Sequence, residues 1–275
     1  MPTPARAVTT VALIAVAGVG GLLGARWIGD TLSDPSCEFV VGGASETTTP
    51  ERAANASTIA WQSVQRGLAP RAATIAIATA IQESKLQNIN YGDADSLGLF
   101  QQRPSQGWGT EEEIMDPIYS TNAFYDGLVE VDNWQDGVIT EVAQTVQRSA
   151  FPSAYADHEA EGRVMASALT GESTAALTCD LDAPTSAGDA SALANELQAL
   201  GMQAAVTGQH EVTATGNTTS MAWAMAGWAV THAQGRQITS VSVDNRIWTR
   251  DDNPDTWVSP APTQDEATVT IAVAS

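Results

Sequence analysis

Apolar residues recur at spacings of three and four along the first half of the chain. This pattern predicts amphipathic helices, which we place at Ser57–Arg66, Arg71–Lys85, Pro117–Glu130, Gly137–Arg148 and Asp157–Leu169. Residues 54–180 are therefore expected to form a mainly α domain. The stretch Ser84–Asp116 has no helical pattern and is rich in Gly, Asp, Gln and Trp. A long irregular segment within a helical domain is usually functional, so we expect the site here.

A different pattern begins near residue 190. The spacing of apolar residues predicts helices at Ala190–Leu200 and Ser220–Gln234. The alternation of β-branched residues predicts strands, which we place at Met202–Val206, Ile238–Val243 and Thr268–Val273. The sequence thus predicts a small α+β domain at 190–275, which follows a polar linker at 181–189.

The N-terminal region is apolar. An uncharged run from Ala7 to Ala25 lies between Arg6 and Arg26, and it is about as long as the ~20 residues that cross a bilayer. Residues 1–28 are expected to be a membrane anchor or a cleaved signal peptide. We favour the anchor because no cleavage site with small residues is obvious. Both alternatives place the protein outside the cytoplasm, membrane-anchored or secreted.

The chain has two cysteines. Cys37 lies in a segment, 29–53, that we expect to be a linker, and Cys179 lies at the end of the helical domain. In an oxidising compartment they can pair in only one way, so we expect a disulfide that joins the two ends of this domain. Two cysteines and three histidines make a multi-ligand metal site improbable, and we expect no metal and no cofactor.

The charge balance excludes other classes of protein. The chain has 12 Lys and Arg against 32 Asp and Glu, for a formal net charge of −20. A protein this acidic is repelled by polyphosphate, so we expect no nucleic-acid partner. A hydrophobic content of 43% is enough for a core and excludes a wholly disordered chain.

Candidate chemistry lies at the end of the second predicted helix. Glu83 follows Ala76, Thr79 and Ala80 on one helical face. A carboxyl group on a face of small side chains, beneath a loop, is partly desolvated, which favours its protonated form. Such a group can give its proton to a leaving oxygen.

The loop after Glu83 has the residue types that suit a sugar. Gln101 is an amide that can both donate and accept hydrogen bonds, and Phe100 and Trp108 supply flat apolar surfaces. Sugar rings have apolar faces and polar edges, so this combination points to a carbohydrate substrate.

The order of these residues resembles the soluble lytic transglycosylase and goose-type lysozyme superfamily. The chain has Glu83-Ser84, then Asn88, then the run Gly98-Leu99-Phe100-Gln101-Gln102-Arg103-Pro104, and the resemblance covers about Ala54–Thr170. It implies a lysozyme-like fold, with Glu83 as the catalytic acid and Ser96 and Gln101 lining a site for an N-acetylated sugar.

The chain departs from this family in one motif. The family's later Tyr-Asn-x-Gly is absent, and Tyr155 is the residue that could support Glu83 in its place. Many members need no second carboxylate, because the substrate's own acetamido or 6-hydroxyl group closes onto the anomeric carbon. Asp93 or Asp95 could instead hold a water for an inverting hydrolysis. The sequence leaves hydrolysis and transglycosylation both open.

The C-terminal part is similar to a small domain found at the C-termini of secreted actinobacterial wall-associated proteins. The similarity rests on Gly227–Gln234, Val241–Trp248 and Trp257, and it implies no firm activity. Trp248 and Trp257 could form a binding surface, but core packing is the favoured interpretation.

Together these features predict a peptidoglycan glycosidase that cleaves the β-1,4 bond between N-acetylmuramic acid and N-acetylglucosamine, for local cell-wall remodelling. Its expected partners are peptidoglycan glycan strands, the membrane through the N-terminal segment, and an envelope protein. The alternative hypothesis is a catalytically idle peptidoglycan-binding or scaffold protein of a cell-envelope apparatus.

Overall fold

The computed structural model describes residues 34–148, 154–250, 257–259, 265 and 267–275. The chain from Pro35 to Ser275 forms one compact unit, and its described residues have an α+β fold with two antiparallel sheets. The expected anchor or signal peptide at 1–28 lies outside the described residues. No helix in the described ranges is long and apolar enough to cross a membrane.

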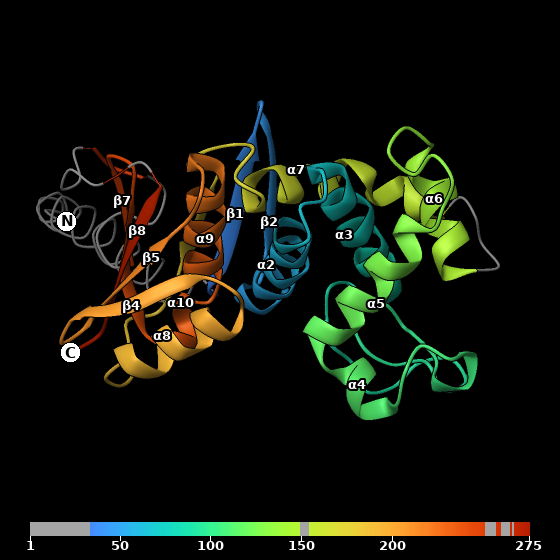
Figure 1. Cartoon of the computed structure of the whole chain (residues 1–275), viewed down its shortest axis with the longest axis horizontal. Coiled ribbons are helices and arrows are strands. Elements are labelled where there is room, and N and C mark those ends of the chain that lie inside the picture. The colour runs from blue at the N-terminus through green and yellow to red at the C-terminus, as the bar shows by residue number, and fades with distance from the viewer. Residues whose placement is uncertain (1–33, 149–153, 251–256, 260–264, 266) are drawn as a thin grey trace, which may run out of the picture. The chain divides into compact units, whose positions relative to one another are not determined.

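The first lobe is helical. Its elements are α2 (Pro50–Gln65), α3 (Pro70–Ser84), α4 (Glu111–Met115), α5 (Pro117–Val129), α6 (Ile139–Gln147) and α7 (Glu159–Leu169), with two 3₁₀ turns, η1 (Pro104–Gln106) and η2 (Ala154–His158). Every residue of α3 from Ala72 to Ile81 is buried. α7 crosses α3 closely at Gly162, where a Cβ would lie 3.0 Å from the backbone of Thr74 and Ala78. The small residues of α3 therefore make it the central helix of this lobe (Figure 1).

A small sheet covers one side of the helical lobe. Its strands are β1 (Ser36–Val41), β2 (Ala44–Thr48) and β3 (Leu177–Asp180), in the order β2-β1-β3. The prediction of a linker at 29–53 is therefore wrong from Ser36 onward. The Gly42-Gly43 pair makes a hairpin turn with both φ values positive (60° and 87°), a geometry that glycine adopts without strain.

The two cysteines pair as predicted. Cys37 and Cys179 lie opposite each other in the register of β1 and β3 and form a disulfide across 142 residues of sequence. The disulfide joins the two ends of the helical lobe and indicates an oxidising, extracytoplasmic environment.

The second lobe combines helices with a five-stranded antiparallel sheet. Its elements are α8 (Ala190–Ala199), β4 (Gln203–Gly208), β5 (Glu211–Thr215), α9 (Thr219–Thr231), α10 (Ala233–Arg236), β6 (Ile238–Val243), β7 (Arg246–Thr249) and β8 (Thr268–Val273). The strand order is β4-β5-β8-β6-β7. The expected strands are present, and β5 and β7 are additional. The helix expected at Ser220–Gln234 is divided at His232 into α9 and α10.

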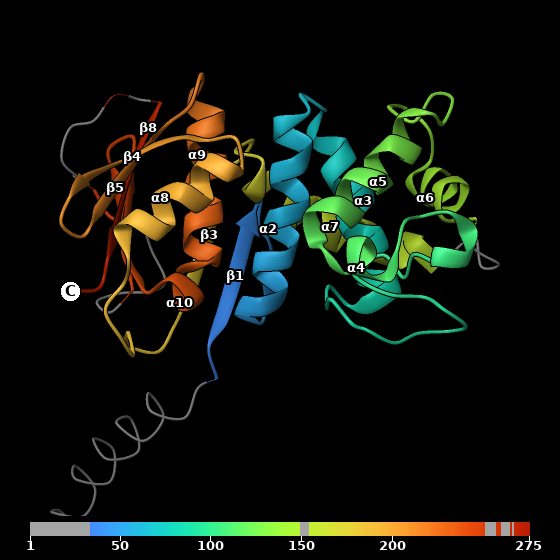
Figure 2. The ribbon, with the colours of Figure 1, turned by 60° about the horizontal axis from the view of Figure 1, so that its bottom comes forward.

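Helix α9 joins the two lobes. It is apolar on all sides, and every residue from Ala222 to Thr231 is buried, as expected of a helix that is covered all round. It contacts α2 on one side and β6 and β8 on the other, and Figures 1 and 2 show it between α2 and the sheet. The two lobes therefore share one hydrophobic core.

Candidate active site

Glu83 lies in the last turn of α3. The helix ends here because Lys85 and Leu86 both have positive φ values, 57° and 58°, and the Leu86 amide turns back to donate to the Ala80 carbonyl at 3.1 Å. Ala76, Thr79 and Ala80, the expected neighbours on the same face, are fully buried. The Glu83 side chain itself is half-buried, so it lies at the boundary between the core and the surface.

Tyr155 contacts this carboxyl group directly. Its hydroxyl donates to Glu83 Oε1 at 2.6 Å, and the tyrosine is fully buried in η2. Glu83 Oε2 has no hydrogen-bond partner among the described residues. The contact therefore fixes one oxygen of the carboxyl group and leaves the other available for a substrate.

A second contact holds η2 against α3. His158 Nε2 lies 3.1 Å from Gln82 Oε1, one residue before Glu83. Residues 149–153, which precede η2, lie outside the described ranges. Tyr155 and His158 thus position η2 beside the last turn of α3 at two points.

The loop after α3 is tied to the helical lobe by hydrogen bonds that are buried or partly buried. Ser84 Oγ donates to Leu99 O at 2.7 Å, Asn55 Nδ2 donates to Leu86 O at 2.8 Å, and Asn88 Nδ2 donates to Met115 O at 2.8 Å. Gly98 has φ of 75°, and a Cβ there would lie 2.7 Å from the Ile114 carbonyl. The motif residues Ser84, Asn88 and Gly98 therefore build the loop rather than contact Glu83.

Gln101 holds two limbs of this loop together. Its Nε2 donates to Gly98 O at 3.2 Å and to Tyr91 O at 3.4 Å. Its own φ is 48°, a conformation rarely adopted outside glycine. Ser96 is buried, and its amide donates to Asp93 O at 3.1 Å. Neither Gln101 nor Ser96 has a hydrogen bond to Glu83, so their expected contact with a sugar stays a prediction.

Asp95 is fully engaged within the loop. Its Oδ1 accepts from Arg103 Nε at 2.7 Å and from Ser105 Oγ at 2.9 Å, and its Oδ2 accepts from the Ser105 amide at 2.8 Å. The hydrogen bond from Arg103, followed by those from Ser105, holds the pKa of Asp95 well below its usual range. A carboxylate so stabilised is a weak base, which argues against Asp95 as the group that activates a water. Nothing in the sequence pattern predicts this network.

The expectation that Phe100 contacts a substrate is wrong. Phe100 was expected to offer a flat face to a substrate, but it is fully buried and stacks on Phe124 of α5, with ring centroids 4.7 Å apart and an interplanar angle of 15°. Its carbonyl accepts from Gln147 Nε2 at 2.7 Å. Phe100 therefore anchors the loop in the core and links it to α6, the helix before η2.

No protein-family model matches this chain, and no curated protein matches its sequence. Among the described residues, no group of three or more His, Cys, Asp or Glu is placed to hold a metal ion.

Proposed function

We propose that this protein is a peptidoglycan glycosidase with a lysozyme-like helical lobe and that Glu83 is its general acid. The observation that carries the proposal is the 2.6 Å hydrogen bond from Tyr155 to Glu83 Oε1. It orients a half-buried carboxyl group at the end of the central helix and leaves Oε2 to present a proton. The order of Glu83-Ser84, Asn88 and Gly98–Pro104 supports the same assignment.

In the proposed first step, Glu83 Oε2 gives its proton to the oxygen of the β-1,4 bond. The bond between this oxygen and C1 of N-acetylmuramic acid breaks, and N-acetylglucosamine leaves with a new 4-hydroxyl group. Positive charge develops at C1 and on the ring oxygen. The Tyr155 hydroxyl keeps its hydrogen bond to Glu83 Oε1 and so holds the carboxyl group in place during the proton transfer.

The second step is proposed to use the substrate's own 6-hydroxyl group. Its oxygen attacks C1, and its proton returns to Glu83, which restores the acid. The product is a 1,6-anhydromuramic end, so the reaction is that of a lytic transglycosylase and consumes no water. Hydrolysis through Asp95 is disfavoured because Asp95 is bound by Arg103 and Ser105 and makes a poor base. Asp93 is the other carboxylate that could hold a water, so the products of the reaction decide between the two routes.

We further propose that the protein remodels wall next to the membrane to which its N-terminal segment tethers it. The disulfide supports an extracytoplasmic location. The net charge of −20 disfavours adsorption to anionic walls at large, which fits a tethered enzyme that acts locally, beside an envelope protein partner.

The test is digestion of purified peptidoglycan sacculi by the full chain and by its Glu83→Gln variant, followed by mass spectrometry of the released muropeptides. Glutamine keeps the shape but cannot give a proton, so we expect a loss of ~100-fold or more in product. Glu130→Gln is the matched control, because Glu130 is an exposed carboxylate at the end of α5. It should cleave as the unaltered chain does.

The products decide the reaction class. Anhydromuramic ends support the transglycosylase, and reducing N-acetylmuramic ends support a hydrolase. Intact glycan with every folded form of the protein, together with equal binding of sacculi, would reject the enzyme in favour of a scaffold protein.

A further inference from the structure

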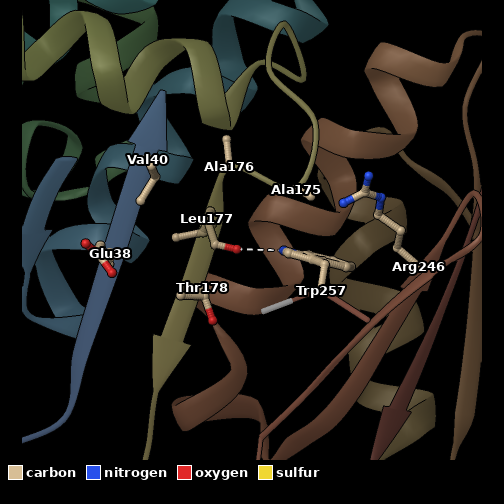
Figure 3. A pocket seen from close by; sticks show the side chains of 8 residues that line it. All are labelled: Glu38, Val40, Ala175, Ala176, Leu177, Thr178, Arg246 and Trp257. Carbon is tan, nitrogen blue, oxygen red and sulfur yellow. Dashed lines mark hydrogen bonds between the residues drawn. The ribbon is translucent and has the colours of Figure 1, made fainter. Parts of the chain in front are cut away.

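A pocket away from Glu83 lies between the small sheet and the C-terminal lobe. It has a volume of about 280 Å³, just below the range of roughly 300–1,000 Å³ for small-molecule sites. Figure 3 shows its walls, which include Glu38, Val40, Leu177, Thr178, Arg246 and Trp257. None of its lining residues belongs to α3, η2 or the loop after Glu83.

The aromatic wall of this pocket is fixed in place. Trp257 Nε1 donates to Leu177 O at 2.7 Å, which caps the edge of β3 (Figure 3). The indole also packs edge to face on Trp223, with ring centroids 5.0 Å apart. Val40 contributes an exposed apolar side chain, 48% accessible. The apolar part of the pocket therefore needs little ordering before a ligand binds.

Opposite charges line the two sides. Glu38 comes from β1 and Arg246 from β7, and Figure 3 shows them on either side of Leu177. Neither side chain has an ion pair or hydrogen bond with another residue that the structure describes. The pocket thus presents an acceptor for a cation at one side and a donor for a carboxylate at the other.

A buried hydroxyl in the same wall lacks a partner. Thr178 Oγ1 is shielded from solvent and has no hydrogen bond with any described residue. Buried polar atoms in proteins are nearly always hydrogen-bonded. Because the atom is shielded, a ligand in the pocket would bond to it only after the Thr178 side chain turns toward the ligand.

We propose that this pocket binds the peptide stem of peptidoglycan, with a carboxylate of the stem on Arg246 and an ammonium group of its diamino acid on Glu38. A neutral sugar ring could hydrogen-bond to both side chains but would neutralise neither charge. A simple anion would be repelled by a chain of net charge −20, whereas a ligand that carries both charges fits both walls. The assignment of the ligand to peptidoglycan rests on the proposed function. The pocket would hold the enzyme on regions of the wall whose peptides are not cross-linked.

The test is calorimetric titration of the full chain in mild detergent with a synthetic stem tetrapeptide. Two modified peptides are titrated alongside it: one with amidated carboxylates and one with an acetylated side-chain amine. We expect each modification to weaken binding about tenfold, the size of one lost charge-assisted hydrogen bond. Arg246→Gln should abolish the difference in affinity between the free and the amidated peptide. Glu38→Gln should abolish the difference in affinity between the free and the acetylated peptide.

Matched controls remove charges elsewhere. Arg163 and Glu141 are exposed. Arg163→Gln and Glu141→Gln should leave both differences in peptide affinity unchanged. The proposal fails if the chain binds no form of the peptide, or if Arg246→Gln and Glu38→Gln keep the differences. It also fails if peptide-free chitin oligomers, rather than the peptide, shift the NMR signal of the Trp257 indole N–H.

This result is separable from the proposed function. Peptide binding without cleavage of sacculi would keep the pocket assignment and reject the glycosidase. Cleavage of sacculi without peptide binding would support the glycosidase and reject the pocket assignment. Arg246→Gln should leave the cleavage of peptide-free glycan unchanged.

Discussion

The indole of Trp61 donates a hydrogen bond from Nε1 to the Leu200 carbonyl at 2.8 Å. Trp61 belongs to α2 in the helical lobe, and Leu200 ends α8 in the C-terminal lobe. This bond lies beside the packing of α9 on α2, so the two lobes meet through a polar contact as well as an apolar core. They should unfold together in one transition.

Trp61→Phe tests this coupling. Phenylalanine fills much of the space but leaves the Leu200 carbonyl without its donor, at a cost of ~1–3 kcal/mol. Urea denaturation should show a lower free energy of unfolding with a single transition, by both tryptophan fluorescence and far-ultraviolet circular dichroism. Two separate transitions in the unaltered chain would contradict a shared core.

Tyr155→Phe should separate catalysis from stability. Tyr155 and Tyr125 are both fully buried, and each loses one hydrogen bond on mutation, because Tyr125 Oη donates to Ile59 O at 3.0 Å. Both Phe variants should be destabilised by ~1 kcal/mol. In a glycan-cleavage assay, only Tyr155→Phe should lower kcat, by ~10- to 100-fold, with KM little changed. Equal effects of the two variants on kcat would remove Tyr155 from the site.

Ser84→Ala should loosen the loop that follows Glu83. The Ser84 hydroxyl links α3 to the loop through Leu99 O, whereas the equally buried Ser120 hydroxyl donates to Asp116 O at the start of α5. We expect Ser84→Ala to raise amide hydrogen exchange in residues 87–102 and to lower activity several-fold. Ser120→Ala is the control and should leave exchange in these residues unaltered.

Removal of the disulfide should destabilise the protein strongly. The bond spans 142 residues, and the loop-entropy relation gives an upper value of ~5 kcal/mol for a closed loop of this size. The double variant Cys37→Ser and Cys179→Ser should unfold at a correspondingly lower urea concentration. Dithiothreitol should bring the unaltered chain to the same midpoint and leave the double variant unaffected.

His232 should make the C-terminal lobe sensitive to acid. Its ring stacks on Trp228 at 4.0 Å, and burial lowers its pKa to about 4, against a raising effect of the hydrogen bond to the Trp228 carbonyl. Of the nearby charges, Arg236 also lowers this pKa and Glu196 raises it.

The unfolded state takes up the His232 proton near pH 6.5 and the folded state only near pH 4. Stability should therefore fall as the pH falls between these values, by up to ~3 kcal/mol. His232→Asn keeps a donor near Trp228 but does not titrate. Urea denaturation at pH 7 and pH 4.5 should show a larger loss for the unaltered chain than for His232→Asn, and parallel losses would contradict the assignment.

Much of the helical lobe could be predicted from periodicity. The expected helix at Arg71–Lys85 is α3, Pro70–Ser84, because proline and a run of Ala and Ile mark it clearly. The N-terminus of α2 was missed. Thr49 caps this helix by accepting from the Arg52 amide, and Pro50 follows in its first turn, but both had been assigned to a linker.

Apart from the contact of Tyr155 with Glu83, which the family resemblance suggests, the candidate site could be predicted only where neighbours in sequence are neighbours in space. Glu83 and the loop after it follow each other along the chain, and their relation was visible in the motif. The burial of Phe100 depends on Phe124, and the state of Asp95 depends on Arg103 and Ser105. Such contacts depend on how α5 and the loop pack, and local sequence patterns do not predict this packing.

The disulfide also determines how the fold would respond to a pulling force. A pull on the chain before Pro35 acts first on β1, and Cys37 is the second residue of that strand. The covalent bond to Cys179 passes the load directly to β3 at the far end of the helical lobe. The hydrogen bonds of β1 beyond Ser36 therefore cannot break one after another under this force, because the disulfide bears the load. A tether attached to the N-terminal segment would pull on a covalently cross-linked part of the fold.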